Sequence, residues 1–127
     1  MDIQNFELEH KDITQKIIGA AFEVYAVLGY GFLEKVYQKA MQVELQRAGL
    51  RVEIERKIKV TSKGVIVGEY EADLFVEEKV IVELKVARNY VSEDEPQLLN
   101  ELKATSIRVG LLINFGRTRV EFKRFVF

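Results

Sequence analysis

The stretch YEADLFVEEKVIVELKV, Tyr70–Val86, decides the fold because it reads as two β-strands joined by an acidic turn. Asp73, Glu83 and Lys85 interrupt runs of apolar residues that would otherwise suit a buried sheet. A charge in a buried strand is costly unless it is paired or holds a metal ion. The stretch therefore predicts either cross-strand charge pairs on a solvated hairpin or a site that uses these three side chains.

The register of this hairpin separates the two interpretations. Ile81, Glu83 and Lys85 share one face of the second strand. Asp73 joins that face only if the loop has three or five residues or the hairpin has a bulge, because a two-residue turn would put Asp73 on the opposite face. In the favourable register the Asp73 and Glu83 carboxylates stand opposite each other, with Cβ atoms roughly 5 Å apart.

Two carboxylates this close repel, and one tends to take up a proton unless a cation is present. Mg²⁺ would resolve the conflict, because it prefers one or two carboxylates together with waters and substrate phosphate. The Lys85 amine would reach a water on such an ion. A surface hairpin with ordinary charge pairs stays open as the alternative.

Two helices are expected before this hairpin. The first covers residues 13–29 with Asp12 as its N-cap, and Gly29 and Gly31 break it. The second covers residues 32–48 and ends at Gly49. Its expected inner stripe consists of four apolar residues at helical spacing: Leu33, Val36, Ala40 and Val43.

The strands are expected at residues 52–60, 65–76, 79–86, 107–115 and 118–126, with a TSKG turn after the first. A short helix at 95–105 carries Pro96 in its first turn. The fourth strand is almost continuously apolar, which predicts burial on both faces, and the last alternates as an edge strand does. The order α-α-β-β-β-α-β-β indicates a mixed sheet flanked by helices, in the α/β or α+β class.

Composition narrows the possible functions. The chain has 127 residues, no cysteine and a single histidine, His10. One domain over residues 1–127, with residues 1–11 as an N-terminal extension, is expected at this length. Thiolate chemistry is excluded, and a catalytic triad or multi-histidine metal site would depend on His10 alone. Any chemistry should therefore use carboxylates, lysine and a hard metal ion.

The polar start, MDIQNFELEH, is unlike a signal peptide. The longest uncharged apolar run, Val24–Leu33, is too short to cross a membrane. A cytoplasmic location is expected.

Several motifs resemble the GxxExxY protein family, a branch of the PD-(D/E)XK nuclease-like superfamily. The naming motif is present as GFLEKVY, with Gly31, Glu34 and Tyr37, and the core motif is present as Asp73 followed by the ELK of Glu83–Lys85. QLLNELKAT and VGLLINFG also resemble the family's C-terminal half. The resemblance implies a restriction-endonuclease-like mixed sheet with the acidic hairpin at its centre.

The resemblance also implies a metal-dependent phosphodiester hydrolase. Asp73, Glu83 and the Leu84 backbone carbonyl would bind Mg²⁺ or Mn²⁺, with Glu34 as a further acidic ligand. Lys85 would orient or deprotonate the attacking water and counter charge on the phosphate.

Gln97 and Tyr37 are expected near the cleft, although Tyr37 could equally serve packing or a hydrogen bond to a site carboxylate, and Gln97 could be a solvated polar residue. Glu34 could instead stabilise the start of its helix. Arg117 and Arg119 could hold phosphates, or could only keep an edge strand from associating.

Two acids depart from the family pattern. Related groups often have Gln-x-x-x-Tyr, whereas this chain carries Glu101 at the tyrosine position and Glu95 just upstream of Gln97. Acids beside a phosphate-binding cleft disfavour the binding of nucleic acid, and the net charge of −1 supplies no field that would attract it.

The leading interpretation is a nuclease acting on DNA or RNA, without membrane partners, which could need a homodimer to hold a duplex. The alternatives are an inactive nucleic-acid- or protein-binding module with the nuclease fold, and an enzyme acting on another phosphate-bearing substrate.

Overall fold

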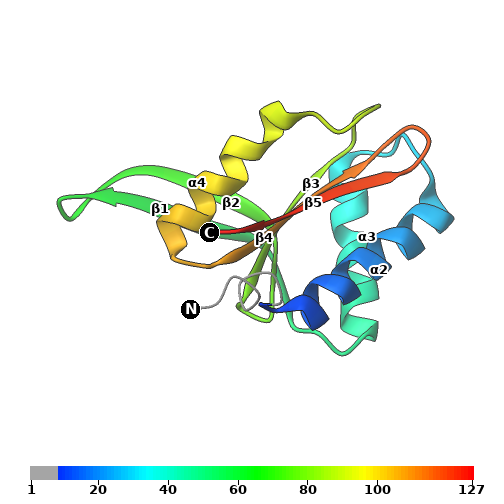
Figure 1. Ribbon diagram of the computed structural model, residues 1–127, viewed down its shortest axis with the longest axis horizontal. Helices are drawn as coiled ribbons and strands as arrows, with labels where there is room; N and C mark the ends of the chain where they lie inside the picture. Colours follow the sequence, from blue (N-terminus) through cyan, green and yellow to red (C-terminus); the bar gives the residue numbers. More distant parts are fainter. Residues whose placement is uncertain (1–8) are drawn as a thin grey trace.

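The computed structural model describes residues 9–127, which form one mixed sheet with helices on both faces (Figure 1). Residues 1–8, most of the expected N-terminal extension, lie outside the described residues. No helix in the described part of the chain is long and apolar enough to cross a membrane. The elements are α2 (Lys11–Leu28), α3 (Glu34–Arg47), β1 (Val52–Ser62), β2 (Val65–Val76), β3 (Val80–Lys85), the 3₁₀ helix η1 (Ser92–Asp94), α4 (Glu95–Thr105), β4 (Val109–Phe115) and β5 (Val120–Val126).

The five strands follow each other across the sheet in the order β1-β2-β3-β4-β5, so β3 is central. Only β3 and β4 are parallel, and α4 lies in the connection between them. Parallel neighbours need such a crossover, whereas the antiparallel pairs are joined by turns. The predicted element order and the mixed sheet are confirmed.

Alternation along β3 divides the interior into two cores. Val80, Val82 and Leu84 pack with α2 and α3 on one face of the sheet. Ile81 packs with α4 on the other face, where Glu83 and Lys85 also point. Every residue of β4 is buried, as its continuous apolar run predicts. The charged residues of β3 therefore lie on the α4 side of a central strand.

The first helix ends as expected but begins earlier. Gly29 has φ 65°, and its N–H donates to the Tyr25 carbonyl, which closes α2. The prediction that Asp12 caps the helix is wrong, because α2 starts at Lys11 and His10 occupies the cap position without a side-chain cap. Asp12 instead lies in the first turn, where its charge still favours the positive end of the helix dipole.

The predicted inner stripe of α3 is wrong. Leu33 is 78% exposed and Val43 51% exposed, because the helix turns another face to the sheet. The buried residues are Tyr37, Gln38, Met41 and Leu45. This face buries the large Tyr37 ring and lets Gln38 Nε2 donate to the Asp73 carbonyl at 2.9 Å, which fixes the rotation of the helix.

Strand β2 pairs with two neighbours over different lengths. Its pairing with β1 runs from Val65 to Val76, whereas its pairing with β3 stops at the Leu74–Val82 pair. Beyond that point the β1–β2 hairpin extends away from the rest of the sheet as an arm beside α4 (Figure 1). Glu55, across from Asp73, has a left-handed φ of 57°, so the arm is irregular at the fork. Asp73 stands where β2 leaves β3.

Candidate active site

The β2–β3 hairpin has the register that puts Asp73 and Glu83 on one face. Val76 pairs with Val80 and Phe75 with Ile81, which leaves a loop of three residues, Glu77–Lys79. Glu77 and Glu78 both adopt positive φ values, as this tight loop requires. The predicted three-residue alternative is confirmed, and the two-residue turn is not present.

Asp73 is held by two contacts at the fork. Its Oδ2 accepts a hydrogen bond from the Leu84 N–H at 2.8 Å, and its backbone carbonyl accepts one from Gln38. The carboxylate thus satisfies a strand N–H that lies beyond the last β2–β3 pair. This geometry fixes Asp73 beside the end of β3.

Glu34 reaches the same place from the first turn of α3. Partial desolvation and the Asp73 carboxylate raise the pKa of Glu34, while the charge of Lys85 lowers it. Glu34 is the first residue of α3, where its charge also favours the positive end of the helix dipole, so the expected role at the helix start is compatible with its place in the site. Glu34, Asp73 and Lys85 are near neighbours.

Glu83 is only 2% exposed and lies between two other carboxyl groups. Burial raises its pKa most, followed by the closeness of the Glu101 carboxyl group and of Asp73. Burial also raises the pKa of Glu101. The cluster therefore extends from α3 through the hairpin to α4, and we call its four acids, Glu34, Asp73, Glu83 and Glu101, the carboxylate cluster.

The sequence places Glu101 beside the site, and the structure has it in the carboxylate cluster, but its side chain is fully buried. A signal was available: Leu98, Glu101, Leu102 and Thr105 follow the i, i+3, i+4, i+7 spacing of an inward-facing helix stripe. Leu98 and Leu102 are indeed buried in the α4 core.

Lys85 is half-buried at the end of β3, opposite Asn114 of β4. Its positive charge lowers the pKa of both Glu34 and Glu101. Asn114 was missed from the sequence: it is buried, and its amide exchanges hydrogen bonds of 3.0 and 2.9 Å with the backbone of Ala87. These two hydrogen bonds fix the segment of chain that leaves β3 just after Lys85.

The remaining predicted site residues differ in whether they lie near the carboxylate cluster. Gln97 lies one turn before Glu101 and close to it, so it borders the carboxylate cluster. Tyr37 does not line a cleft, because it is fully buried; its hydroxyl donates to the Gly29 carbonyl at 2.5 Å and its ring stacks on Phe115. Arg117 and Arg119 are exposed on the turn after β4.

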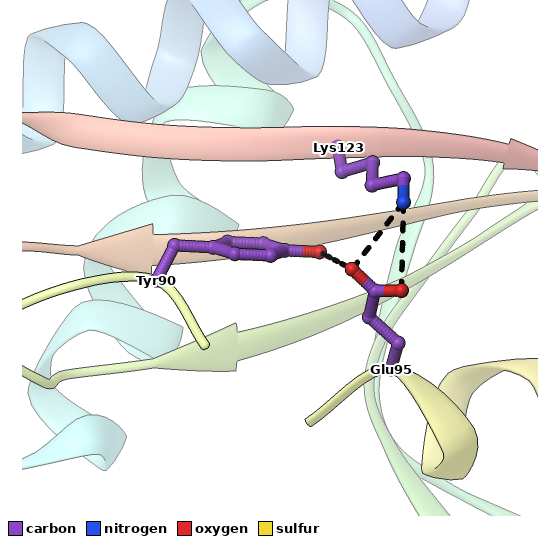
Figure 2. Close-up of polar contacts among 3 residues, drawn as sticks. All are labelled: Tyr90, Glu95 and Lys123. Carbon is purple, nitrogen blue, oxygen red and sulfur yellow. Dashed lines mark hydrogen bonds and ion pairs between the residues drawn. The ribbon is translucent and has the colours of Figure 1, made fainter. Parts of the chain in front are cut away.

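Glu95 is not a free acid. Its Oε2 accepts a hydrogen bond from the Tyr90 hydroxyl at 2.8 Å and lies 3.4 Å from Lys123 Nζ (Figure 2). Lys123 reaches it from β5, so the ion pair joins the start of α4 to the edge strand. This pairing weakens the repulsion of phosphate that the sequence predicts from Glu95.

The donor set fits a hard divalent cation. Glu83 Oε1 and both Glu101 oxygens are buried without a hydrogen-bond partner, which is unfavourable for ionised carboxylates but suits oxygen ligands of a metal ion. Within residues 9–127, no three His, Cys, Asp or Glu side chains are already arranged around one point. Mg²⁺ needs only one or two carboxylates plus waters, so the pairs Asp73–Glu83 and Glu83–Glu101 are each sufficient.

Comparisons with known proteins agree with this fold. The sequence profile described as the PD-(D/E)XK nuclease superfamily matches residues 11–125. No curated protein sequence matches the chain. A solved structure described as "Crystal structure of SSO0001" matches with a TM-score of 0.59 at 16% identity, over 96% of this chain and 61% of that chain. At this identity the match shows the fold alone, and this chain spans less than two-thirds of that protein's length.

Proposed function

The chain belongs to the PD-(D/E)XK nuclease superfamily, and we propose that it hydrolyses phosphodiester bonds of DNA or RNA with the help of Mg²⁺ or Mn²⁺. The observation that carries the proposal is the convergence of Asp73, Glu83 and Lys85 on one face of the hairpin, with Glu34 arriving from α3. Narrower membership of the GxxExxY family, a cytoplasmic location and action as a homodimer belong to the same proposal.

The residues have distinct roles in this mechanism. Asp73, Glu83 and the Leu84 carbonyl would hold the cation, and Glu34 would add a ligand directly or through water. The bound ion would stabilise charge on the phosphate and lower the pKa of a water. Lys85 would orient or deprotonate the attacking water and offset negative charge as it develops on the phosphate.

Substrate would approach past exposed or half-buried polar groups. Gln97 borders the carboxylate cluster, and Arg117 and Arg119 lie on the turn that follows the strand carrying Asn114, the partner of Lys85. Arginines in this place would contact phosphates without reading sequence. The ion pair of Glu95 with Lys123 removes one source of repulsion from this approach.

The test is a cleavage screen with mixed DNA and RNA substrates in Mg²⁺ or Mn²⁺, with a chelator as the blank. The wild-type protein should cleave at least one substrate class, and Asp73→Asn should abolish cleavage while leaving the fold intact. Cleavage that persists in the chelator, or that Asp73→Asn retains at the wild-type rate, would contradict the proposal.

A second candidate is a binding module that keeps the nuclease fold without turnover. The net charge of −1 and the fully buried Glu101 in the carboxylate cluster favour it, because neither helps a polyanion bind. Metal titration separates the two candidates: the enzyme should bind Mn²⁺ through Asp73 and Glu83, whereas the module should bind it weakly or not at all.

A further inference from the structure

Glu101 is an acid in a place that ordinarily holds an apolar residue. It is 0% exposed, and neither carboxylate oxygen has a hydrogen-bond partner of good geometry in the part of the chain that the structure describes. The Gln97 amide approaches from the preceding turn without making such a bond. An ionised carboxylate in this condition is strongly unfavourable unless a cation accompanies it or the pair with Glu83 shares a proton.

The packing of α4 keeps the Glu101 side chain out of contact with solvent. Leu98 and Leu102 rest directly on Gly110 of β4, where an added Cβ would lie 2.9 Å from Leu98 Cδ1. This close contact fixes the face that α4 presents to the sheet. Glu101 lies on that same face, and its carboxyl group contacts Glu83, whose Oε1 is also buried and without a partner.

No cationic side chain already fills this need. Among residues 9–127, the ion pairs within 4.0 Å involve neither Glu83 nor Glu101, and Lys85 forms none of them. The groups facing one another are oxygen donors without imidazole or thiolate, which is the ligand chemistry of a hard divalent ion such as Mg²⁺ or Mn²⁺.

We propose that Glu101 is a metal ligand, sharing with Glu83 a divalent cation held between β3 and α4. The inference rests on the proposed function and deepens it, because it assigns to α4 a ligand in addition to those of the β2–β3 hairpin and α3. Metal binding then links α4 to β3 through these two acids, so the cation should also hold α4 against the sheet.

The experiment is calorimetric Mn²⁺ titration of the whole chain, with thermal melting of each variant in chelator and in excess Mn²⁺. Glu101→Gln is the test variant, and Glu93→Gln is the matched control. Glu93 is an exposed acid just before α4, so this substitution removes the same charge from the surface. Glu101→Gln should weaken Mn²⁺ binding by about tenfold or more, the lower end of what the loss of one supporting carboxylate produces. Glu93→Gln should stay within about twofold of wild type.

Melting supplies a readout independent of cleavage. Glu101→Gln should melt higher than wild type in chelator, because it removes a buried charge, and should gain less on addition of Mn²⁺. Glu101→Met, which replaces the acid by an apolar side chain of similar length, should show the same pattern. This second variant keeps the test valid if the buried amide of Glu101→Gln destabilises the fold.

The outcomes separate this inference from the proposed function. Unchanged Mn²⁺ affinity in both Glu101 variants, with affinity lost in Asp73→Asn, would overturn the role of Glu101 and leave the nuclease proposal standing. Weakened Mn²⁺ binding in the Glu101 variants of a protein that cleaves no substrate would support the ligand and contradict the nuclease. Absence of Mn²⁺ binding in the wild type would overturn both.

Discussion

At the scale of single residues, Asp73 combines a structural role with a proposed chemical one. Its Oδ2 accepts the Leu84 N–H, while the rest of its charge faces Glu34 and Glu83. Asp73→Asn keeps an oxygen acceptor and removes the repulsion, so the metal-free protein should be as stable as wild type or slightly more stable.

Asp73→Ala is the matched change, because it removes the acceptor as well and leaves the Leu84 N–H unsatisfied. It should cost about 1–3 kcal/mol in the free energy of unfolding. Urea unfolding of both variants in chelator measures the difference. If Asp73→Asn proves as damaging as Asp73→Ala, the negative charge itself stabilises the fold and Asp73 is an ion-pair partner.

At the scale of elements, the position of α4 depends on the absence of a side chain at Gly110. Gly110→Ala would push against both Leu98 and Leu102. Overpacking of this kind costs about 1–3 kcal/mol, so the free energy of unfolding should fall by that amount. Gly19→Ala is the control, because nothing lies within 4 Å of the added Cβ and alanine favours the helix at this exposed position of α2.

Gly110→Ala should also weaken Mn²⁺ binding if α4 contributes a ligand, since the substitution displaces the helix that carries Glu101. Unfolding curves and a Mn²⁺ titration on the same preparation measure both effects. A destabilised variant with unaltered metal affinity would show that α4 serves the fold without serving the carboxylate cluster.

The elements that the sequence predicts correctly are those whose signals are local. Alternation along β3 fixes that Ile81, Glu83 and Lys85 share a face, whatever packs on it, whereas Asp73 joins that face only because the loop has three residues. The orientation of α3 was predicted wrongly because Leu33, Val36 and Val43 form a plausible apolar stripe, yet Tyr37 and Met41 on another face fill more of the core. The choice between the two faces depends on the sheet, which the helix sequence does not contain.

Some residues of the candidate site could be predicted from the sequence and others could not. The pattern of one hairpin singles out Asp73, Glu83 and Lys85, but it leaves a charge-paired surface hairpin open, and only the resemblance to the family's core motif assigns their roles. Glu101 was missed as a buried residue because acids are rarely buried without a partner, so exposure is the reasonable expectation for it. Tyr37 follows the packing alternative, and its hydroxyl bonds to Gly29, a backbone group whose position only the folded chain defines.

At the scale of the whole molecule, the carboxylate cluster makes stability depend on pH. Burial and neighbouring acids raise the pKa of Glu34, Glu83 and Glu101 above the ordinary value of 4.5. Between that value and their raised values, the folded protein binds more protons than the unfolded chain, so stability falls as pH rises. Each extra proton retained contributes about 1.4 kcal/mol per pH unit.

The metal-free protein should therefore melt at a higher temperature near pH 5 than near pH 8, and Glu101→Gln should reduce this slope. Saturating Mn²⁺ should oppose it, because a cation binds the deprotonated carboxylates. Melting curves in chelator and in Mn²⁺ across this range provide the measurement. A metal-free melting temperature that rises from pH 5 to pH 8 would show that the cluster does not govern stability.

The proposed role of Lys85 is tested most directly by comparing Lys85→Ala with wild type in single-turnover cleavage and Mn²⁺ titration on the same preparations. Removing the amine should slow cleavage by about 10²–10⁴-fold, the range for a positioned proton-transfer or charge-stabilising group. Mn²⁺ affinity should stay the same or rise slightly, because the carboxylates supply the ligands and a nearby cation opposes metal binding. Cleavage at the wild-type rate by Lys85→Ala, in a preparation that binds Mn²⁺ normally, would contradict the account.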